Sequence, residues 1–438
     1  MLLLGLDVGS SSVKAGLLRN GWLVGDLVRA AYPTRHQAEK VEVDPHNIFA
    51  AVIDAIRQLP AQKKIDAVAF SVMSPAFVLM DRRGKPLTPI ITHQDRRALK
   101  QAHQIESRVG EKRHLALAGN RPFPGSISST TFLWFKQNAP AVVKKADLLA
   151  HLNTYLLRQF TGARAIDPAN ASFTGLYNTV TQTGWCEELI KAVGVSPHIL
   201  PDIHDAATIA GTLTAASAAA LGLRQGIPLY TGLIDTSSAM LLIHPKPGQM
   251  LNNNGSTDVL ALCTDRPKPH PDLLTRALGS GKLWLSVATM AAAGSALNWA
   301  RDQFFSDLNP KAFDRLLKKL VTQTPSDPAH GVRFDNYLAG QRAGMEQKKA
   351  AYANLTLSTT RQDMLAALIE SLARDSAARL PLLCAGQKNV DRHVTLTGGL
   401  GGALHSLLHR DWPGKWTFHT EDEAALRGLW QLVERSTP

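Results

Sequence analysis

Residues 5–17, GLDVGSSSVKAGL, form the stretch that decides the fold. An apolar run leads to Asp7, a turn of Gly and Ser follows, and VKAGLLR resumes the apolar pattern. This spacing predicts two short strands joined by a tight turn at residues 8–12. Asn20-Gly21 then predicts a hairpin into a third strand, WLVGDLVRAA, because both residues tolerate the positive φ of a type I′ turn.

A helix and a fourth strand follow this unit. Apolar residues recur at helical spacing from Ile48 to Leu59, and Asp44-Pro45 before them suits a helix cap and first turn. The apolar run 65–71 then predicts a strand parallel to the first. Three strands, a helix and a parallel strand indicate an α/β domain built around a mixed sheet.

The second half of the chain repeats the same pattern. Residues 249–263, QMLNNNGSTDVLALC, again place a Gly/Ser/Thr turn between two predicted strands. Thr360 and Asp363 form a capping-box pattern ahead of a helix, and the strand HVTLT ends in Gly398-Gly399. We expect a boundary near residue 246, in Pro-Lys-Pro-Gly, and therefore two domains, 1–246 and 247–438.

Composition narrows the class of protein. The chain has 438 residues, 45% hydrophobic and 19% charged, which excludes a disordered tail, a collagen and a disulfide miniprotein. Three distant cysteines without a CxxC motif predict buried, reduced thiols and a cytoplasmic protein. We expect no signal peptide, because Asp7 interrupts the apolar start, and no membrane span.

The chain is basic. Its 48 Lys and Arg against 36 Asp and Glu give a net charge of +12. The basic residues are scattered pairs rather than a basic helix, so the charge favours anionic small molecules over nucleic acid.

Three glycine-rich turns could bind phosphate or a nucleotide. Asp7 precedes a Gly/Ser turn and Lys14, which can cradle phosphate while the carboxylate holds Mg²⁺. The turn 254–258, NGSTD, has the same composition and flanks, so the two turns could grip a polyphosphate from both sides of a cleft. The turn 398–402, GGLGG, would let a flat ring approach its backbone, although a tight turn without a ligand would look the same.

Asp235 is the candidate catalytic carboxylate. It follows a predicted strand, LYTGLI, and precedes a helix-like run. A carboxylate at the carboxyl end of a strand is well placed to act on a ligand in the crevice. A helix N-cap is the alternative interpretation, because Asp is favoured there.

Six ordered blocks together resemble the FGGY carbohydrate kinases, which include xylulokinases, ribulokinases and glycerol kinases. The resemblance spans the chain from Gly5 to about Gly428. The blocks are GLDVGSSSVKAGL, DPANASFTGLYNTVTQTGW, LPDIHDAATIAGTLT with GLRQGIPLYTGLIDTSSA, NNNGSTDVLAL, YLAGQR and TLTGGL.

The resemblance implies a pair of ribonuclease-H-like domains of the actin and hexokinase type around a central cleft, with ATP, Mg²⁺ and a sugar meeting there. It implies Asp235 as catalytic base, and Asp7 as the carboxylate near Mg²⁺. The other implied contacts are Ser10, Ser11, Lys14, Gly255, Ser256 and Thr257 for phosphate, Gly398, Gly399 and Leu400 for adenosine, and Met73, Ser74, Asp95 and Asp235 for the sugar.

The acceptor is expected to be a ketopentose, D-xylulose or D-ribulose, with glycerol, another polyol or an aldonate as alternatives. Met73 matches a xylulokinase Met-His pair, but Ser74 replaces the His. HQDRRA resembles a glycerol-kinase segment, but His93 stands where an aromatic residue is expected. The sequence therefore matches neither the xylulokinase pattern nor the glycerol-kinase pattern completely.

Other classes of protein compete with a sugar kinase. An actin-like or chaperone-like ATPase would use the same phosphate loops without a small acceptor. His405 and His409 have zinc-site spacing but no Glu and no third ligand, so we expect a solvated helix face there. The expected partners are therefore a small sugar and ATP, with no nucleic acid and no membrane, and a homodimer stays open.

Overall fold

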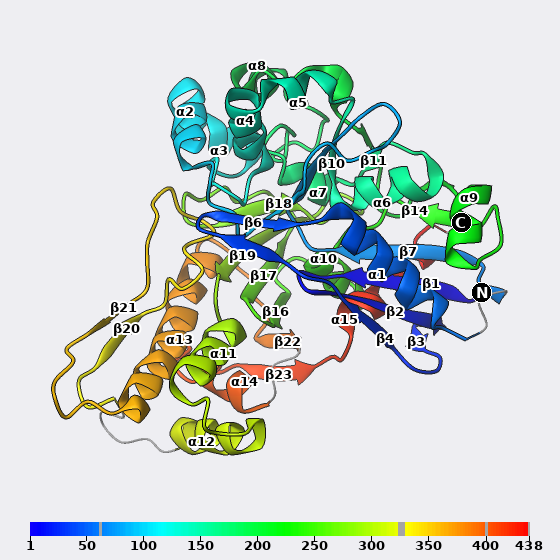
Figure 1. Ribbon diagram of the computed structural model, residues 1–438. Helices are drawn as coiled ribbons and strands as arrows, with labels where there is room; N and C mark the ends of the chain where they lie inside the picture. The colour runs from blue at the N-terminus through cyan, green and yellow to red at the C-terminus, as the bar shows by residue number, and fades with distance from the viewer. Residues whose placement is uncertain (61–63, 323–328, 399–401, 437–438) are drawn as a thin grey trace.

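The computed structural model describes residues 1–60, 64–322, 329–398 and 402–436. Two lobes make up the molecule, each built around a β-sheet with helices packed on it (Figure 1). The first half of the chain, blue to green in Figure 1, forms the upper and right-hand part, and the yellow and orange elements lie at the lower left.

An eight-stranded sheet organises the first lobe. Strand β1 (Leu3–Val8) pairs antiparallel with β2 (Ser12–Arg19) and parallel with β7 (Ala67–Val72), which confirms the strand, turn, strand and parallel-strand prediction. The other members of the sheet are β3 (Trp22–Leu23), β4 (Val28–Ala31), β13 (Ile209–Thr212), β14 (Pro228–Tyr230) and β15 (Leu233–Ile234).

The predicted hairpin after β2 is confirmed, but the strand beyond it is shorter than expected. Asn20 and Gly21 have φ values of +51° and +80°, as a type I′ turn requires. The expected strand 22–31 is divided into β3 and β4, because Gly25 at φ +79° interrupts the extended backbone.

Helices cover both faces of this sheet. Alternate residues of a strand face opposite sides, so Leu4 and Leu6 pack in one core and Leu3 in another. The first core is covered by α1 (Pro45–Arg57), α6 (Leu152–Thr161) and α9 (Ala215–Leu221), and the Asp44 carboxylate caps α1 as predicted. The opposite core is covered by α10 (Asp235–Leu242) and α15 (Ala424–Glu434).

A five-stranded sheet and its helices extend the first lobe beside the cleft. Its strands are β5 (Arg35–Gln37), β6 (Lys40–Val43), β8 (Ala76–Met80), β9 (Ile90–Thr92) and β10 (Leu148–His151). Its helices and small elements are α2 (Leu99–Val109), α3 (Glu111–Ala118), α4 (Ser128–Asn138), α5 (Pro140–Lys145), α7 (Pro168–Ser172), α8 (Glu187–Val193), η2 (Pro197–Ile199), β11 (Ala165–Ile166) and β12 (Asp202–Ile203).

The second lobe repeats the strand pairing of the first. β16 (Met250–Asn254) pairs antiparallel with β17 (Asp258–Thr264) and parallel with β22 (His393–Thr397), as β1 does with β2 and β7. The predicted internal repeat is therefore present. The lobe also contains β18 (Leu274–Ala277), β19 (Trp284–Met290), β20 (Arg333–Asp335), β21 (Ala351–Ala353), β23 (Thr417–Thr420), α11 (Gly294–Phe304), α12 (Pro310–Thr322), α13 (Arg361–Cys384) and α14 (Gly402–His409).

The chain passes between the lobes more than once. It leaves the first lobe after α10, and β16 begins the second-lobe sheet at Met250. Helix α15 then returns to pack against α10 and β1. A single division near residue 246 stays a prediction. Within the described ranges, no helix combines the length and the hydropathy that crossing a bilayer requires.

Candidate active site

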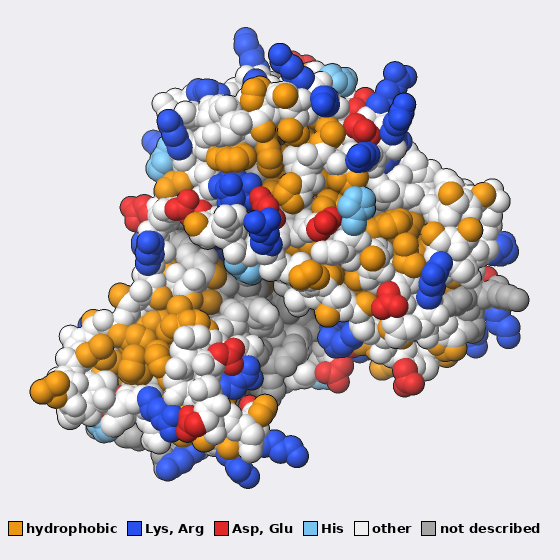
Figure 2. Space-filling model, in the orientation of Figure 1, with side chains coloured by type: hydrophobic (Ala, Val, Ile, Leu, Met, Phe, Trp, Pro, Cys, Tyr) orange, Lys and Arg blue, Asp and Glu red, His pale blue; other side chains and the backbone are white. Residues whose placement is uncertain are grey.

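Two adjoining cavities form a cleft between the lobes, and Figure 2 shows the surface hollowed there. The smaller cavity has a volume of about 290 Å³ and lies toward the five-stranded sheet. The larger cavity has a volume of about 780 Å³ and lies toward the second lobe and the start of α15. The residues that line both are Asp7, Lys14, Arg29, Asp235, Asn253, Gly255, Ser256 and Gly398. The predicted phosphate loops and the predicted base therefore meet where the two cavities join.

The register of the strands places Asp7 between the side chains of Ser71 and Lys14. Asp7 lies opposite Lys14 on β2 and opposite Ser71 on β7. The Ser71 hydroxyl donates to Oδ1 of Asp7 at 2.7 Å. Burial, and after it the negative charge of Asp235, raise the pKa of Asp7 to about 6. The charge of Asp235 therefore disfavours ionisation of Asp7, and a cation bound near Asp7 would favour the ionised form.

The first phosphate loop is held from behind by backbone acceptors. The amide of Gly9 donates to the carbonyl of Ser12 at 3.0 Å, and the Thr34 hydroxyl donates to the carbonyl of Ser10 at 3.1 Å. The side chains of Ser10 and Ser11 line the smaller cavity. The loop therefore offers hydroxyls to the cleft, as predicted.

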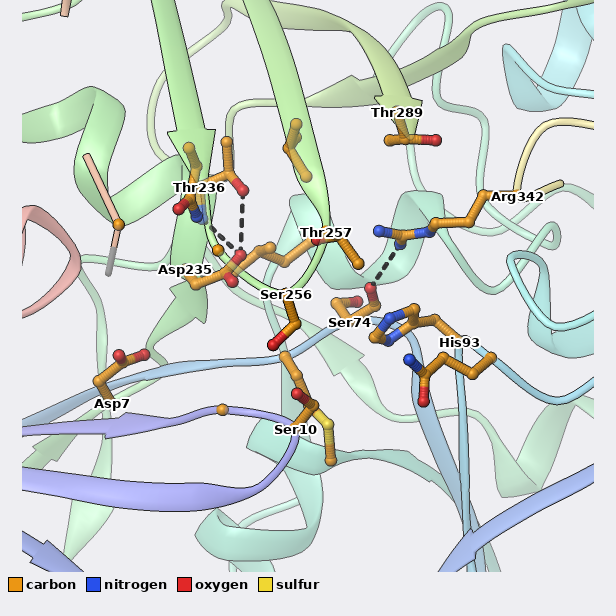
Figure 3. Close-up of a pocket in the computed structure, with 18 of the residues that line it drawn as sticks. Asp7, Ser10, Ser74, His93, Asp235, Thr236, Ser256, Thr257, Thr289 and Arg342 are labelled. Carbon is orange, nitrogen blue, oxygen red and sulfur yellow. Dashed lines mark hydrogen bonds between the residues drawn. The ribbon is translucent and has the colours of Figure 1, made fainter. Parts of the chain in front are cut away.

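The second phosphate loop is attached to the start of α11. The amide of Ala293 donates to the carbonyl of Ser256 at 2.9 Å, and the Ser295 hydroxyl donates to the same oxygen at 2.8 Å. Ser256 and Thr257 face the cavity that Ser10 also lines (Figure 3). The two predicted loops are thus brought to one cleft.

Asp235 is the first residue of α10, directly after β15. Its Oδ1 accepts hydrogen bonds from the Thr236 amide at 2.6 Å and the Thr236 hydroxyl at 3.0 Å, drawn dashed in Figure 3. Its other oxygen has no hydrogen-bond partner among the described residues, and Asp235 lines both cavities. The alternative interpretation as a helix N-cap is not met, because Ile234 holds the N-cap position and Asp235 is the first helical residue, bonded only to the residue that follows it.

Gly232 allows the backbone just before Asp235 to pack closely against β7. Gly232 has φ +72°, and a Cβ there would collide with the carbonyl oxygen and ring of Phe70 on β7. Only glycine lets β15 lie this close to β7, which brings the Asp235 carboxylate toward Asp7.

The third glycine-rich turn is described only at its first residue. Gly398 lines both cavities at φ +111°, and a Cβ there would collide with the carbonyl oxygen of Asn254. The turn therefore starts against the second phosphate loop. Gly399 and Leu400, predicted to contact adenosine, lie outside the described residues.

Of the four predicted sugar contacts, Met73, Ser74 and Asp235 line the cleft and Asp95 does not. Met73 and Ser74 line the smaller cavity. Asp95 is not brought to the cleft, so its assignment to the sugar stays a prediction: its side chain is 1% exposed, Oδ2 accepts from the Val41 amide at 2.8 Å and the Arg97 guanidinium at 2.6 Å, and Oδ1 accepts from the Arg97 amide at 3.0 Å. Because both oxygens are occupied by protein donors, Asp95 supports the loop instead of presenting an acceptor to the cleft.

Several side chains that the sequence did not assign to a site also line the smaller cavity, among them His93, Arg276, Thr289 and Arg342. Figure 3 shows His93, Thr289 and Arg342 grouped on the side away from Asp7. Arg276 lies mid-strand in the buried β18, LTRA, and a charge in such a run is a signal that could have been used.

Burial and nearby charges together shift the pKa values of His93, Arg276 and Arg342. Burial, with repulsion by Arg342 and Arg96, holds the pKa of His93 well below its ordinary value, so the ring is neutral. Burial lowers the pKa of Arg276 and of Arg342 to about 10, so both guanidinium groups stay protonated at neutral pH.

The two histidines of α14 do not form a solvated face, which corrects that expectation. His405 Nδ1 lies 2.8 Å from Asn254 Oδ1, and His409 Nε2 lies 2.7 Å from Asn252 Oδ1. Burial lowers the pKa of His409 to about 4. Across the described ranges, no group of three His, Cys, Asp or Glu side chains is arranged to hold a metal ion.

Comparisons with known proteins agree with this architecture. Among curated proteins, gluconokinase of Bacillus subtilis (strain 168) is 26% identical over 93% of this chain and 81% of its own length. Xylulose kinase of Staphylococcus xylosus is 22% identical over 90% of this chain and 82% of its own. The crystal structure of ligand-bound xylulose kinase from Lactobacillus acidophilus superposes with a TM-score of 0.86 at 21% identity, covering 99% and 89% of the two chains.

Family models match both halves of the chain. The N-terminal domain model of the FGGY family of carbohydrate kinases matches residues 2–241, and the C-terminal domain model matches residues 250–405. The expected α/β fold with two ribonuclease-H-like domains of the actin and hexokinase type is confirmed by the solved relatives. The chain therefore belongs to the FGGY family of carbohydrate kinases, enzymes that are ATP-dependent.

Proposed function

We propose that this protein transfers the γ-phosphoryl group of ATP to a hydroxyl of a small carbohydrate in the cleft, with Asp235 as general base. The observation that carries the proposal is the position of the Asp235 carboxylate. It lies at the junction of the two cavities, with one oxygen fixed by Thr236 and the other open to the cleft.

The larger cavity is the proposed nucleotide side. The loops at Ser10 and Ser256 would hold the phosphates from two sides, and Gly398 starts the turn proposed for adenosine. A helix start behind the second loop adds a favourable field for negative charge. ATP would then lie with its terminal phosphate at the junction with the smaller cavity.

The carboxylate of Asp7 fits a bound Mg²⁺. Mg²⁺ prefers oxygen ligands, and it needs only one or two carboxylates when phosphates and waters complete its shell. The raised pKa of Asp7 shows a buried carboxylate that a nearby cation would stabilise. When bound there, Mg²⁺ would neutralise charge on the phosphate oxygens.

The proposed reaction transfers one phosphoryl group and one proton. An acceptor hydroxyl oxygen attacks the γ-phosphorus of ATP, the bond from that phosphorus to the bridging oxygen breaks, and ADP leaves. The open oxygen of Asp235 accepts the hydroxyl proton, while the Thr236 donors keep the carboxylate oriented. Closure of the lobes about the segment before β16 would keep water from taking the place of the acceptor.

Two classes of acceptor fit the relatives' names. A ketopentose, D-xylulose or D-ribulose, is supported by the relatives named xylulose kinase, and an aldonate by those named gluconokinase. The smaller cavity, about 290 Å³ with Met73 and Ser74 in its wall, suits a monosaccharide of either kind. We place the reaction in the cytoplasm, where ATP is available.

A screen for acceptor-dependent ADP formation tests the proposed function. Purified protein with ATP and Mg²⁺ would be assayed against ketopentoses, polyols, aldonates and glycerol, with an acceptor-free control. We expect ADP to form at least tenfold faster with one carbohydrate than without any. Equal ADP formation with and without every acceptor would instead support an ATPase of the actin or chaperone class.

A further inference from the structure

Two buried arginines face the acceptor cavity without a carboxylate partner. Arg276 is 2% exposed and Arg342 is 8% exposed. Arg276 donates to the Ser237 hydroxyl, and Arg342 donates to the carbonyl of Ser74 at 3.2 Å. Among the residues that the structure describes, neither guanidinium forms an ion pair. A buried charge left in this state is costly, and natural proteins keep it paired.

The acidic groups nearby supply too little negative charge. Asp235 is the carboxylate that acts on both guanidinium groups, and Asp167 acts on Arg276. Burial raises the pKa of Asp167 to about 7, so this group is only partly ionised at neutral pH. The side chains that line the smaller cavity include four cationic groups, Lys14, Arg29, Arg276 and Arg342, against the two carboxylates Asp7 and Asp235, so the lining has an excess of positive charge.

Further polar atoms around the same cavity also lack partners. The Ser74 hydroxyl, both ring nitrogens of His93, the Thr289 hydroxyl and Nε of Arg342 have no hydrogen-bond partner among the described residues. All four side chains line the smaller cavity. A neutral imidazole offers one donor and one acceptor, and hydroxyls offer both, so this group matches the hydroxyls of a carbohydrate.

We propose that the acceptor is a sugar acid, whose carboxylate binds Arg276 and Arg342 and whose hydroxyls bind Ser74, His93 and Thr289. This inference rests on the proposed kinase function and deepens it. A carboxylate can accept two parallel hydrogen bonds from a guanidinium, which gives both charge and orientation. Its negative charge complements the positive excess of the cavity lining.

The position of the arginines also sets the orientation of the acceptor. Figure 3 shows Arg342 on the far side of the cavity from Asp7, with Asp235 between them. A carboxylate bound at Arg342 would therefore lie at the end of the acceptor away from the phosphate loops, and a hydroxyl at the other end would reach Asp235. We expect phosphorylation at a hydroxyl remote from the carboxylate.

The test compares acceptors that differ only in the acidic group. Aldonates of five and six carbons would be paired with the alditols of the same hydroxyl configuration, and D-xylulose, D-ribulose and a sugar phosphate added. We expect kcat/KM for the best aldonate to exceed that for its alditol by about 10² or more. A ketopentose or sugar phosphate used at least tenfold faster than every aldonate would overturn the inference.

Variants of Arg276 show whether this arginine binds the acceptor or acts on the transferred phosphate. Arg276→Met should raise the KM for the aldonate about 10²-fold and lower kcat/KM at least tenfold more for the aldonate than for the best neutral acceptor, and Arg276→Lys should recover part of the loss. Arg113→Met, at an exposed arginine on α3 that does not line the cleft, is the matched control. Equal losses for charged and neutral acceptors would mean that the arginine acts on the phosphate and would overturn the inference.

Calorimetry without ATP keeps the inference testable if a variant does not fold. The wild-type protein should bind the aldonate at least tenfold more tightly than its alditol. This readout also distinguishes the two proposals, because binding without any phosphoryl transfer would contradict the kinase function alone. Equal binding of aldonate and alditol would contradict the sugar-acid inference even if transfer is observed.

Discussion

The ammonium nitrogen of Lys14 lies 2.6 Å from Oε2 of Glu423, a residue 409 positions later in the chain. Arg29 reaches the other oxygen of the same carboxylate at 2.9 Å. Lys14 is a predicted phosphate ligand, and all three residues line the larger cavity. Glu423 therefore holds the cation that a bound nucleotide would use, at the point where the chain returns to the first lobe.

Glu423→Gln is expected to lower the KM for ATP. The substitution removes a negative charge beside the proposed phosphate site and frees Lys14. Partly exposed ion pairs contribute up to about 1 kcal/mol, so the fall should be up to about fivefold. Steady-state kinetics with varied ATP gives the value, and Glu370→Gln, which breaks a pair with Arg410 on the second lobe, is the matched control. An unchanged or higher KM for ATP would contradict this role of Glu423.

Thr257→Ala is expected to raise the KM for ATP about tenfold, because a hydroxyl bound to a charged phosphate is lost. Thr257→Ser keeps the hydroxyl and should restore most of the affinity. Kinetics with each substrate varied in turn makes the distinction. A change in the acceptor KM with no change for ATP would assign this loop to the other substrate.

Asp95→Ala is expected to destabilise the fold instead of acting on the acceptor. The Arg97 side chain is 4% exposed and would be left with Glu42 as its carboxylate partner. Breaking a buried pair from one side costs about 3–5 kcal/mol, measured as the free energy of unfolding in denaturant. Asp95→Ala with Arg97→Met should recover part of the loss. A stable Asp95→Ala protein with a raised acceptor KM would restore the sequence-based assignment.

Local signals explain why much of the fold was predictable. Asn20-Gly21 specifies a turn by its allowed φ, and the Thr360 and Asp363 pair specifies a helix start, so both appear as expected. The strand and turn pattern of residues 5–17 recurs at 249–263 because the same sheet pairing recurs. These features depend on neighbours in sequence, which a sequence reading can use.

The acceptor side was less predictable, because its residues come together only through the tertiary fold. Asp95 appeared suited to sugar hydroxyls, but Arg97, two residues later, occupies it. Arg276 lies on β18 and Arg342 in the segment between β20 and β21, and both reach the cavity that Ser74 lines from the first lobe. No spacing of residues in the sequence indicates that these three side chains lie at one cavity. The excess of positive charge in the cavity is likewise a property of the assembled site.

His151 is expected to make the folded state less stable as the pH drops from about 6.5 toward about 4, whereas the raised pKa values of Asp7 and Asp167 act in the opposite direction. Burial lowers the pKa of His151 to about 4, while the unfolded chain keeps the ordinary value near 6.5. Between these values the unfolded state binds the proton and the folded state does not, so each such group costs up to about 1.4 kcal/mol per pH unit.

Denaturant unfolding at pH 7, 5.5 and 4.5 measures this slope. His151→Gln should show a smaller loss of stability between pH 7 and 4.5 than the wild type, whatever its stability at pH 7. His419→Gln, at an exposed histidine on β23, is the control and should keep the wild-type slope. Identical slopes for His151→Gln and the wild type would contradict the assignment.

The fate of the γ-phosphoryl group in wild-type protein and in Asp235→Asn tests the central claim most directly. Phosphorus NMR, with ATP, Mg²⁺ and the best acceptor from the screen, would separate phosphorylated acceptor from inorganic phosphate. The wild type should form the phosphorylated acceptor, and Asp235→Asn should form it about 10² to 10⁴ times more slowly, with ATP affinity nearly unchanged. Near-wild-type transfer by Asp235→Asn, or inorganic phosphate as the main product of the wild type, would contradict the account.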